Sequence, residues 1–516
     1  MSGLDYPGRQ NICGEIMDTL TTTTTPQIPK LDMQYRTLPD ALHATVEPYG
    51  ASSPKLVAYN GDLGRSLGFD ISFADEPAAA ATFFAGNHRP APQPALAMAY
   101  AGHQFGGFVP RLGDGRAHLL GEAVTESGER FDIQLKGSGQ TPFSRQGDGR
   151  AALGPVLREY VVAEAMAALG IPTSRALAAV LTGDMVLREG VQPGAILTRV
   201  AASHLRVGTF EYAARLSDPN VLDALVQFAL QRHPVETDAD IVRDGRPGLT
   251  LLQAVIARQA KLIAQWMGVG FIHGVMNTDN CTISGETIDY GPCAFMDGYN
   301  PAQVYSSIDH MGRYAFANQP GIAHWNMAVL AQALLRAIDP NEETAVSLAQ
   351  EAVNHFPAQF EAAYRTVMRT KLALPGTDDG DVQLIDDLLG LMAESEADFT
   401  GTFRALGAAI EDGAPLVQFL GADASSWLQR WRDRLGNIET AAIRVQLNAV
   451  NPAIMPRNHR VEAMIAAAYD GDFEPFSAMV EALKSPYAEP ASSGQAALLA
   501  TPPAADEVVH ATFCGT

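Results

Sequence analysis

The segment that most constrains this chain is residues 273–291, HGVMNTDNCTISGETIDYG. Two short apolar runs, residues 281–283 and 287–288, flank the turn sequence SGE, and this arrangement predicts a tight hairpin. Such a hairpin would bring Asn280 and Asp289 together at its open end. One amide oxygen beside one carboxylate suits a hard divalent cation whose other ligands are water and phosphate oxygens.

The same residues also have a purely structural interpretation. Asp279 and Asn280 are common turn formers, and Asp289 can cap the segment that follows. The combination of HG, N-x8-D and DYG after a long apolar helix, predicted from Leu249 to Met267, favours the metal site instead. It is the order found in kinases, where a catalytic-loop Asn and the Asp of a D-[FY]-G triplet hold the ions.

A lysine and a glutamate upstream have the order of a second kinase feature. Two apolar-rich runs between Ala117 and Lys136 flank ESGE, which predicts a β-hairpin with Lys136 at the polar end of its second strand. LREYVVAEAMAALG predicts a helix that carries Glu159. A strand lysine followed by a helix glutamate matches the pair that grips ATP phosphates. The alternative, two solvated charges, stays open.

Two glycine-containing loops offer candidate phosphate contacts. Gly113, Gly115 and Arg116 lie in RLGDGR, where backbone without side chains can approach a phosphate closely. The spacing is neither GxGxxG nor a Walker A loop, so this pattern alone is weak. Asp148 and Gly149 lie in SRQGDGR, a second loop that can face the same cleft, and these residues are equally typical of an ordinary turn.

Two arginines stand out in this acidic chain. Arg199 and Arg206 would supply the forked, charge-assisted hydrogen bonds that a triphosphate requires if they converged on one anion. The strand-like ILTRV and Gly208 place them on two short segments rather than on one helix. Surface salt bridges are the alternative, which the residues alone leave open. His204, between the arginines, is expected to be structural.

The proton acceptor of ordinary kinases is missing. Their catalytic loop has an Asp after His-Arg that accepts the proton of the substrate hydroxyl. Here the third position of HGVMNTDN is Val275, and valine cannot act as a base. A carboxylate stands one residue before Asn280, as Asp279. We therefore expect the proton acceptor to have moved along the loop.

Composition narrows the class of protein. The chain has 516 residues, 47% of them hydrophobic and 18% charged, which is typical of a globular protein with more than one domain. A net charge of −22 disfavours non-specific nucleic-acid binding. The four cysteines have no CxxC or metal-type spacing, and no apolar run approaches the roughly 20 residues that span a bilayer. We expect a cytoplasmic enzyme that binds neither nucleic acid nor membrane.

From about Tyr35 to its C-terminus the chain resembles the selenoprotein O (YdiU-type) family. The shared motifs are YAGHQFGGFVPRLGDGR, QLKGSGQTPFSRQGDGRA, LREYVVAEAM, LTRVAASHLRVGTFEY, FIHGVMNTDN, DYGPCAFMD and NPAIMPRNHRVEAMI. The resemblance implies an α+β fold of the protein-kinase type, with two lobes, an N-terminal extension and additional C-terminal helices. It also implies that ATP binds in a flipped orientation, so that AMP rather than phosphate passes to Ser, Thr or Tyr hydroxyls of protein substrates.

The resemblance divides the chain into five segments. They are a flexible leader (1–35), an N-terminal extension (36–95), a kinase-like N-lobe (96–190), a mostly helical C-lobe with the metal site (191–484) and a flexible tail with Cys514 (485–516). Apolar periodicity after residue 300 predicts helices. Their expected positions are near 325–338, 343–370, 380–395, 425–450 and 460–484.

Matched motifs also imply roles for single residues. Those that would hold the nucleotide are Gly113, Gly115, Arg116, Lys136, Asp148, Gly149, Arg199, Arg206 and Asp289. Glu159 would partner Lys136. Asn280 and Asp289 would bind Mg²⁺ or Mn²⁺, and Asp279 would accept the proton.

Cysteines raise a separate expectation. Family members carry a selenocysteine or cysteine near the C-terminus, and Cys514 in FCGT occupies that place. Some bacterial members pair it with a cysteine in the loop after the metal-binding Asp, but YNPAQVYSSIDHMGRY has none here. Cys293 is the nearby substitute for a redox pair with Cys514. Two reduced thiols are the alternative.

Four functions remain in view at this point. Protein AMP transfer is the expected one, and Val275 argues against a conventional kinase. The set of Lys136, Asn280, Asp289 and two arginines argues against a catalytically inactive ATP-binding scaffold. Transfer of UMP with Mn²⁺ resembles an activity attributed to some relatives and stays open. The sequence does not identify the target proteins, the acceptor residue or the oligomeric state.

Overall fold

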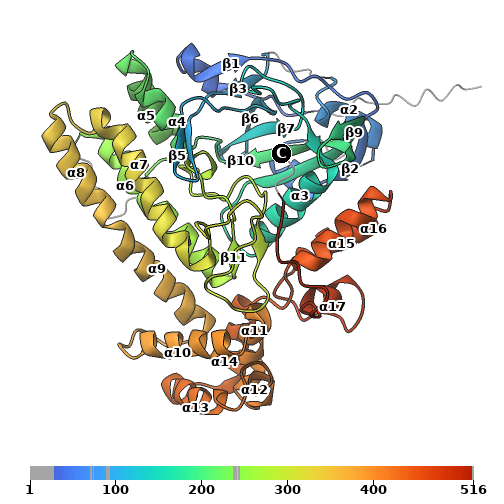
Figure 1. The fold of residues 1–516 in the computed structure, drawn as a ribbon, viewed down its shortest axis with the longest axis vertical. Coiled ribbons are helices and arrows are strands. Elements are labelled where there is room, and N and C mark those ends of the chain that lie inside the picture. The colour runs from blue at the N-terminus through green and yellow to red at the C-terminus, as the bar shows by residue number, and fades with distance from the viewer. Residues whose placement is uncertain are drawn as a thin grey trace, which may run out of the picture.

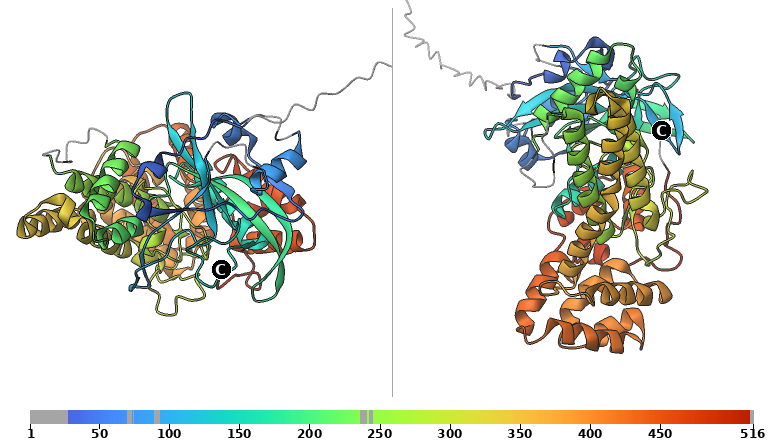
Figure 2. Two further views of the ribbon diagram at one scale, coloured as in Figure 1. Left: turned by 90° about the horizontal axis from the view of Figure 1, so that it is seen from above. Right: turned by 90° about the vertical axis from the view of Figure 1, so that its left-hand side faces the viewer.

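An eight-stranded antiparallel sheet and a large set of helices make up the molecule (Figure 1). The computed structural model describes residues 28–69, 73, 75–88, 93–235, 241 and 245–513. The sheet lies at one end, and long helices run from it to a separate group of helices at the other end (Figure 2). The α+β class expected from the sequence is confirmed.

The main sheet has the strand order β1-β3-β6-β7-β10-β9-β2, and β8 pairs with β10. Its strands are β1 (His43–Thr45), β2 (Lys55–Tyr59), β3 (Leu96–Met98), β6 (Ala117–Val124), β7 (Arg130–Lys136), β8 (Ala151–Ala152), β9 (Arg175–Leu187) and β10 (Val191–Ala201). Two smaller sheets pair β4 (Gly102–Gln104) with β5 (Gly107–Val109) and β11 (Phe271–Ile272) with β12 (Ala294–Phe295). The hairpin predicted between residues 117 and 136 is confirmed as β6 and β7.

The two faces of β7 have different partners because side chains alternate along a strand. Ile133 and Leu135 are fully buried in a cluster with α1 (Gly61–Ser66) and α2 (Pro77–Phe84). Gln134 and Lys136 point to the other face, where α3 covers the sheet. This alternation places polar side chains of the strand in a buried layer rather than in solvent.

Helix α3 (Leu153–Ala168) is the predicted helix that carries Glu159. Pro155 lies in its first turn, where a missing N–H costs nothing, and Gly170 follows its end with a φ of +77°. Its residues Leu157 and Val161 pack on the sheet, and α15 (Asn458–Tyr469) and α16 (Glu474–Leu483) cover it from outside. Glu159 is thereby held between the sheet and the loops that follow α6 (Pro247–Gly268).

Fourteen further described α-helices follow α3 along the chain. They are α4 (Val207–Ala214), α5 (Pro219–Arg232), α6 (Pro247–Gly268), α7 (Gln319–Ile338), α8 (Glu342–Asn354), α9 (Phe356–Lys371), α10 (Asp381–Glu394), α11 (Phe399–Ala409), α12 (Ala414–Leu420), α13 (Ala424–Leu435), α14 (Thr440–Val450), α15 (Asn458–Tyr469), α16 (Glu474–Leu483) and α17 (Gln495–Ala500). Short 3₁₀ helices among the described residues are η1 (Gln34–Thr37), η2 (Asp40–Leu42), η4 (Thr278–Asn280) and η5 (Phe316–Asn318). The apolar helix predicted before the HGVMN segment is confirmed as α6.

Three of the predicted helical spans are each two helices. The span 343–370 breaks at His355, because Pro357 in the first turn of α9 cannot continue the hydrogen bonds of α8. The spans 425–450 and 460–484 break at Gly436 and Gly471, which have φ values of +68° and +89°. Apolar periodicity runs through these breaks, so periodicity alone did not reveal them. Helices α11 and α12 were not expected.

The hairpin predicted for residues 281–288 is wrong. Thr282 pairs with Arg206 and Thr287 pairs with Thr173, so each short run joins a neighbouring segment instead of its partner. The turn between them closes through a side chain, since Thr282 Oγ1 donates to the Glu286 carbonyl at 2.6 Å. Runs of two or three residues form too few cross-strand bonds to outweigh pairing with segments already in place.

Both predicted flexible ends contain packed residues. Residues 1–27 lie outside the described residues, but Leu31 and Tyr35 are buried and Asp32 pairs with Glu122 of β6. Of the predicted tail, 485–513 is described: it contains α17, and the fully buried Thr512 hydroxyl donates to the Pro292 carbonyl at 2.7 Å. The described parts of both ends therefore differ from the expectation.

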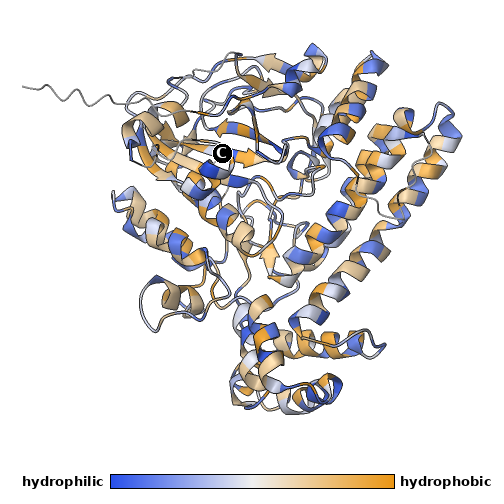
Figure 3. Ribbon diagram, turned by 180° about the vertical axis from the view of Figure 1, so that it is seen from behind, coloured by the Kyte–Doolittle hydropathy of each residue, from blue (hydrophilic) through white to orange (hydrophobic). Residues whose placement is uncertain are grey.

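Hydropathy follows the packing of these helices. Hydrophobic residues gather on the sides of the long helices that face each other, and hydrophilic residues gather on the outer sides (Figure 3). Within the described residues, each helix is either too short or too polar to cross a membrane.

Candidate active site

Three cationic side chains converge on the carboxylate of Asp289. Lys136 Nζ and Arg199 Nη1 donate to Asp289 Oδ1 at 2.9 and 2.5 Å, and Arg206 Nη1 donates to Oδ2. Asp289 has a φ of +59°, a left-handed conformation that is uncommon for a residue with a side chain. The local backbone is therefore held in a disfavoured state where three charges meet, a combination frequent at functional sites.

The sheet register brings two of these cations together. In the antiparallel pairing of β7 and β10, Gln134 lies opposite Arg199 and Lys136 lies opposite Leu197. Residues two apart share one face, so Lys136 and Arg199 project toward α3 side by side. Arg206 comes from the N-cap of α4, just after β10 ends. The expectation that the two arginines lie on separate short segments is confirmed.

Glu159 of α3 completes the cluster. Its carboxylate accepts from Lys136 Nζ at 2.6 Å and from Arg199 Nη1 at 3.4 Å. Arg199 is 2% exposed and Glu159 is 4% exposed, so both charges are removed from water. The structure thus brings together five of the residues singled out in the sequence, Lys136, Glu159, Arg199, Arg206 and Asp289, and excludes the alternative that the Lys–Glu pair is two solvated surface charges.

Electrostatics keep Asp289 ionised. Burial alone would raise the pKa of this carboxyl group, but Lys136, Arg206 and Arg199 together hold the pKa well below its usual range. Burial likewise opposes the charge on Arg199, and Asp289 and Glu159 outweigh it, so that the pKa of the guanidinium is raised. These groups remain charged in the folded protein, so that buried charges of both signs stand together at this point of the structure.

Three residues that support the cluster were not anticipated. Gln134 accepts from Arg199 Nη2 at 2.5 Å and donates from Nε2 to Asp114 at 3.0 Å. The Arg206 guanidinium lies over the Tyr100 ring, 4.7 Å from its centroid. Gln134 could have been found, because it precedes Lys136 by two residues on the same face of a strand.

Asp279 lies on η4, and one of its two carboxylate oxygens accepts a hydrogen bond from a side chain while the other does not. Gln104 Nε2 donates to Oδ2 at 3.2 Å, whereas Oδ1 is buried with no hydrogen-bond partner among the described residues. Burial raises the pKa of this carboxyl group to about 6. A carboxylate with that pKa is mostly ionised at pH 7 and still basic enough to accept a proton, which suits a general base.

The donor set suits a divalent cation shared with a ligand. Asn280 Nδ2 donates to the Val275 carbonyl at 3.0 Å, which leaves the amide oxygen as the free end of that side chain. Nowhere in the described ranges do three or more His, Cys, Asp or Glu side chains gather as a metal site. An oxygen from Asn280 and one from Asp289 would therefore fit Mg²⁺ or Mn²⁺ only with phosphate and water oxygens as the other ligands.

The glycines of RLGDGR are required by packing between loops. Gly113 has a φ of +116°, and a Cβ there would lie 2.5 Å from the Phe143 ring. A Cβ at Gly115 would lie 2.9 Å from the Phe143 carbonyl oxygen. Arg116 is half-buried, and its side chain has no hydrogen bond or ion pair with any described residue. Contact of these three residues with a nucleotide stays a prediction.

Asp148 and Gly149, in the SRQGDGR loop, contact residues other than those of the Asp289 cluster. Asp148 forms an ion pair with Arg188 at 2.9 Å and accepts from the Arg150 amide at 2.9 Å. A Cβ at Gly149, whose φ is +68°, would lie 2.2 Å from the Gly139 carbonyl carbon. In the described part of the chain no contact joins Asp148 to Asp289, so its role at the nucleotide stays a prediction.

Two further expectations concern His204 and the cysteines. His204 is buried beside Asp132, with 3.1 Å between Nδ1 and Oδ2, and burial lowers the pKa of the imidazole to about 4. This arrangement agrees with a structural role.

Cys293 is fully buried in the loop after Asp289. Cys514 lies outside the described residues, so the redox pair stays a prediction.

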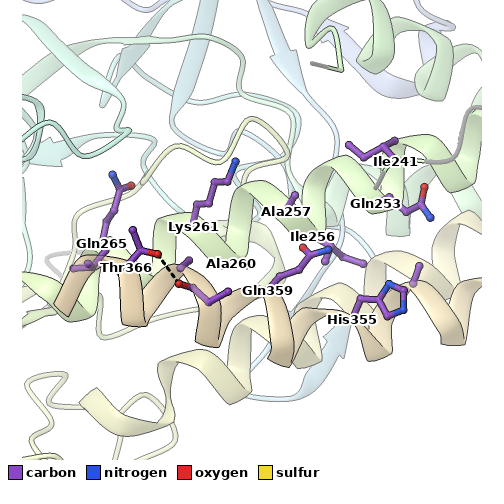
Figure 4. Close-up of a pocket in the computed structure, with 14 residues that line it drawn as sticks. Ile241, Gln253, Ile256, Ala257, Ala260, Lys261, Gln265, His355, Gln359 and Thr366 are labelled. Carbon is purple, nitrogen blue, oxygen red and sulfur yellow. Dashed lines mark hydrogen bonds between the residues drawn. The ribbon is translucent and has the colours of Figure 1, made fainter. Parts of the chain in front are cut away.

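A cavity of about 500 Å³ lies elsewhere, between α6 and the helices α8 and α9 (Figure 4). The described residues that line it include Lys261 and Gln359, and none of these described residues is a carboxylate or an arginine. The hydroxyl of Thr366 is already bonded to the Ala362 carbonyl at 2.8 Å. A triphosphate with its metal ion needs several opposite charges, which the described lining of this cavity lacks and the Asp289 cluster has.

Comparison with known proteins identifies the family of this chain. The sequence profile of the family described as "Protein adenylyltransferase SelO" matches residues 29–484. A protein of Agrobacterium fabrum named "Protein nucleotidyltransferase YdiU" is 52% identical over 495 residues, which cover 94% of this chain and 100% of that protein. Proteins of the same name from Bradyrhizobium diazoefficiens and a Jannaschia species are 53% and 52% identical and cover 93% and 94% of this chain and 98% of each relative. The chain therefore belongs to the SelO family.

Proposed function

We propose that this protein is a metal-dependent protein adenylyltransferase, which transfers AMP from ATP to Ser, Thr or Tyr hydroxyls of other proteins. The observation that carries the proposal is the convergence of Lys136, Arg199 and Arg206 on one buried carboxylate. Family membership and the relatives' names, which specify nucleotidyl transfer to protein, support it. The proposal extends to a kinase-like fold of two lobes, supported by the Lys136–Glu159 pair between a strand and a helix.

Nucleotide binding would exchange the partners of Asp289. Lys136, Arg199 and Arg206 would bind phosphate oxygens in place of the carboxylate, since charge-assisted contacts to phosphate are of the same kind. Asn280 and Asp289 would hold Mg²⁺ or Mn²⁺ together with those phosphates. The ion would supply neutralisation of phosphate charge and polarisation of the reacting phosphoryl group.

Asp279 would remove the proton from the acceptor hydroxyl. The hydroxyl oxygen forms a bond to the α-phosphorus of ATP, and the bond from that phosphorus to the α,β-bridging oxygen breaks. Pyrophosphate leaves with the electron pair of that bond, and the hydroxyl proton passes to the open oxygen of Asp279. Burial and a pKa of about 6 fit this role, because the group is ionised before the reaction and neutral after it.

Labelled nucleotides test the proposal directly. The protein is incubated with candidate acceptor proteins and with ATP labelled either at the α- or at the γ-phosphate, in the presence of Mg²⁺ or Mn²⁺. We expect only α-label on protein. Transfer of γ-label would indicate a conventional kinase and overturn the proposal, and ATP binding without any transfer would indicate an inactive scaffold.

The choice of nucleotide is resolved in the same assay. The relatives' printed name specifies a nucleotidyltransferase without the base. We expect ATP to be preferred over UTP under both metal ions. Exclusive labelling from α-labelled UTP with Mn²⁺ would replace adenylyl by uridylyl transfer and leave the assignment of the site intact.

A further inference from the structure

A small hairpin, β4 and β5, packs directly on the loop that carries Asp279. The His103 amide donates to Thr278 Oγ1 at 2.7 Å, and the Phe105 amide donates to Asn277 Oδ1 at 3.0 Å. The His103 ring is fixed in turn, with 2.6 Å between its Nδ1 and Glu211 Oε1 on α4. The hairpin is therefore held against η4 and its N-cap by the backbone of β4 and of the turn that follows it.

Gln104 lies between those two contacts and reaches the carboxylate itself. Its Nε2 donates to Asp279 Oδ2 at 3.2 Å, and within the described residues this is the one side chain that donates to that carboxylate. The other oxygen, Oδ1, is buried without a partner. The bond from Gln104 orients the carboxylate, and the second oxygen keeps its capacity to accept a hydrogen bond.

The strand also shapes the space beside the open oxygen. A Cβ on Gly102, two residues before Gln104 on the same face, would lie 2.5 Å from Asp279 Oδ1. Residue 102 must therefore be glycine for β4 to lie this close to the Asp279 carboxylate. One strand thus supplies a donor to Oδ2 and, at Gly102, the close approach of its backbone to Oδ1.

We propose that Gln104 is a positioning residue, whose amide orients the Asp279 carboxylate for proton transfer from the acceptor hydroxyl. This inference rests on the proposed function, in which Asp279 accepts the proton. Among the described residues, the Gln104 side chain has no hydrogen bond to Asn280, Asp289 or the three cations of the cluster. Its loss should therefore slow the chemical step and leave nucleotide binding unchanged.

The first test is Gln104→Met, which keeps the length of the side chain and removes its donor. We expect kcat for α-label transfer to fall about tenfold to a hundredfold, the effect of one hydrogen bond to a charged group. KM for ATP should stay within about twofold of the wild-type value. A matched control is Gln383→Met, which removes a similar amide-to-carboxylate bond to Asp387 on the exposed face of α10 and should leave kcat unchanged.

The second test separates positioning from folding. Asp279→Asn removes the acceptor, and in that background Gln104→Met should cause no further fall in kcat, because the residue acts only through Asp279. Gln104→Glu has the shape of the native side chain without its N–H donor, and its kcat should fall at least as far as that of Gln104→Met. Full activity of either Gln104 variant, or additive losses in the double variant, would overturn the inference. Absence of α-label transfer by the wild-type protein would instead overturn the proposed function.

Discussion

At the scale of single residues, Asp289 has the most demanding environment. A left-handed backbone costs of order 1–3 kcal/mol in a residue with a side chain, and the carboxylate is buried. Three cations compensate for that burial. The same carboxylate is thus both the proposed metal ligand and a counter-ion shared by Lys136, Arg199 and Arg206.

This double role predicts opposite effects on binding and on catalysis in Asp289→Asn. The variant lacks the charge that competes with phosphate for three cations, so it should bind ATP without metal more tightly than the wild type, by about tenfold. AMP transfer should be abolished, because the proposed metal ligand is gone. Titration with fluorescent ATP in EDTA, together with the α-label assay, checks both halves. Weaker metal-free binding or retained transfer would contradict the assignment.

Lys371 makes a prediction about stability and pH. It is buried at the end of α9, where Nζ donates to Asn451 at 2.8 Å and lies 4.1 Å from the Phe403 ring centroid. Burial lowers the pKa of the amine from 10.5 to about 7. Between pH 7 and about 10 the unfolded chain therefore binds a proton that the folded chain does not, and folding stability should rise with pH in that window.

The comparison that isolates this effect is wild type against Lys371→Met. Relative to the variant, the free energy of unfolding of the wild type should rise by up to about 1.4 kcal/mol per pH unit above pH 7. Apparent Tm values of both proteins at pH 7, 8 and 9 provide the measurement. A constant difference in Tm across this range would show that the amine is protonated in the folded state as well.

At the scale of elements, the site depends on close approach between α4 and β4. The Ala101 amide donates to the Gly208 carbonyl at 2.9 Å, and a Cβ at Gly208 would lie 2.1 Å from the Ala101 carbonyl oxygen. The first turn of α4 can therefore approach the strand only because residue 208 is glycine. Arg206 is the N-cap of this helix, so the same contact sets the position of a proposed phosphate ligand.

Gly208→Ala should consequently push β4 away from α4. We expect a loss of stability of about 1–3 kcal/mol, as for an overpacked interior, and a lower rate of AMP transfer because Gln104 moves with β4. Gly321→Ala is the matched control, since it also lies in the first turn of a helix and a Cβ there has open space. The control should be neutral or slightly stabilising. Equal Tm values for the two variants would contradict the packing argument.

Elements with strong local signals could be predicted from the sequence, and elements that depend on neighbours could not. The β6–β7 hairpin, α3 and α6 each have turn, capping or periodic signals of their own. The wrong hairpin at residues 281–288 had a turn signal, but its short runs found better partners in Arg206 and Thr173. Gln134 and Gln104 were missed because a polar residue on a strand resembles a solvated one until the covering element is known.

At the scale of the whole molecule, the end of the described chain supports the loop beyond the site. Thr512 is fully buried and donates through its hydroxyl to the carbonyls of Pro292 and Tyr305 at 2.7 and 3.2 Å. Arg457 donates to the carbonyl of Leu499 in α17 and forms ion pairs with Asp297 and Asp398. Contacts over such sequence separations leave no local pattern, which explains why this stretch was expected to be a flexible tail.

Thr512→Val tests this support. Valine has nearly the shape of threonine but no hydroxyl, so the buried Pro292 carbonyl loses its donor at an expected cost of about 1–3 kcal/mol. We expect a lower Tm and faster limited proteolysis between residues 298 and 313. Thr501→Val, which removes a hydroxyl bond to Ala497 on an exposed helix, should change neither. Unchanged proteolysis in Thr512→Val would show that the loop is ordered without the C-terminal contact.

The contact between Thr512 and Pro292 also has a consequence for synthesis. The two residues are 220 positions apart, so at about 5–20 residues per second the ribosome adds the threonine roughly 10 to 40 s after the proline. Throughout that interval a nascent chain already contains Lys136, Arg199, Arg206 and Asp289 but not the segment that steadies the loop after them. The ribosome therefore adds the charged residues of the site well before the C-terminal residues that contact the loop after Asp289.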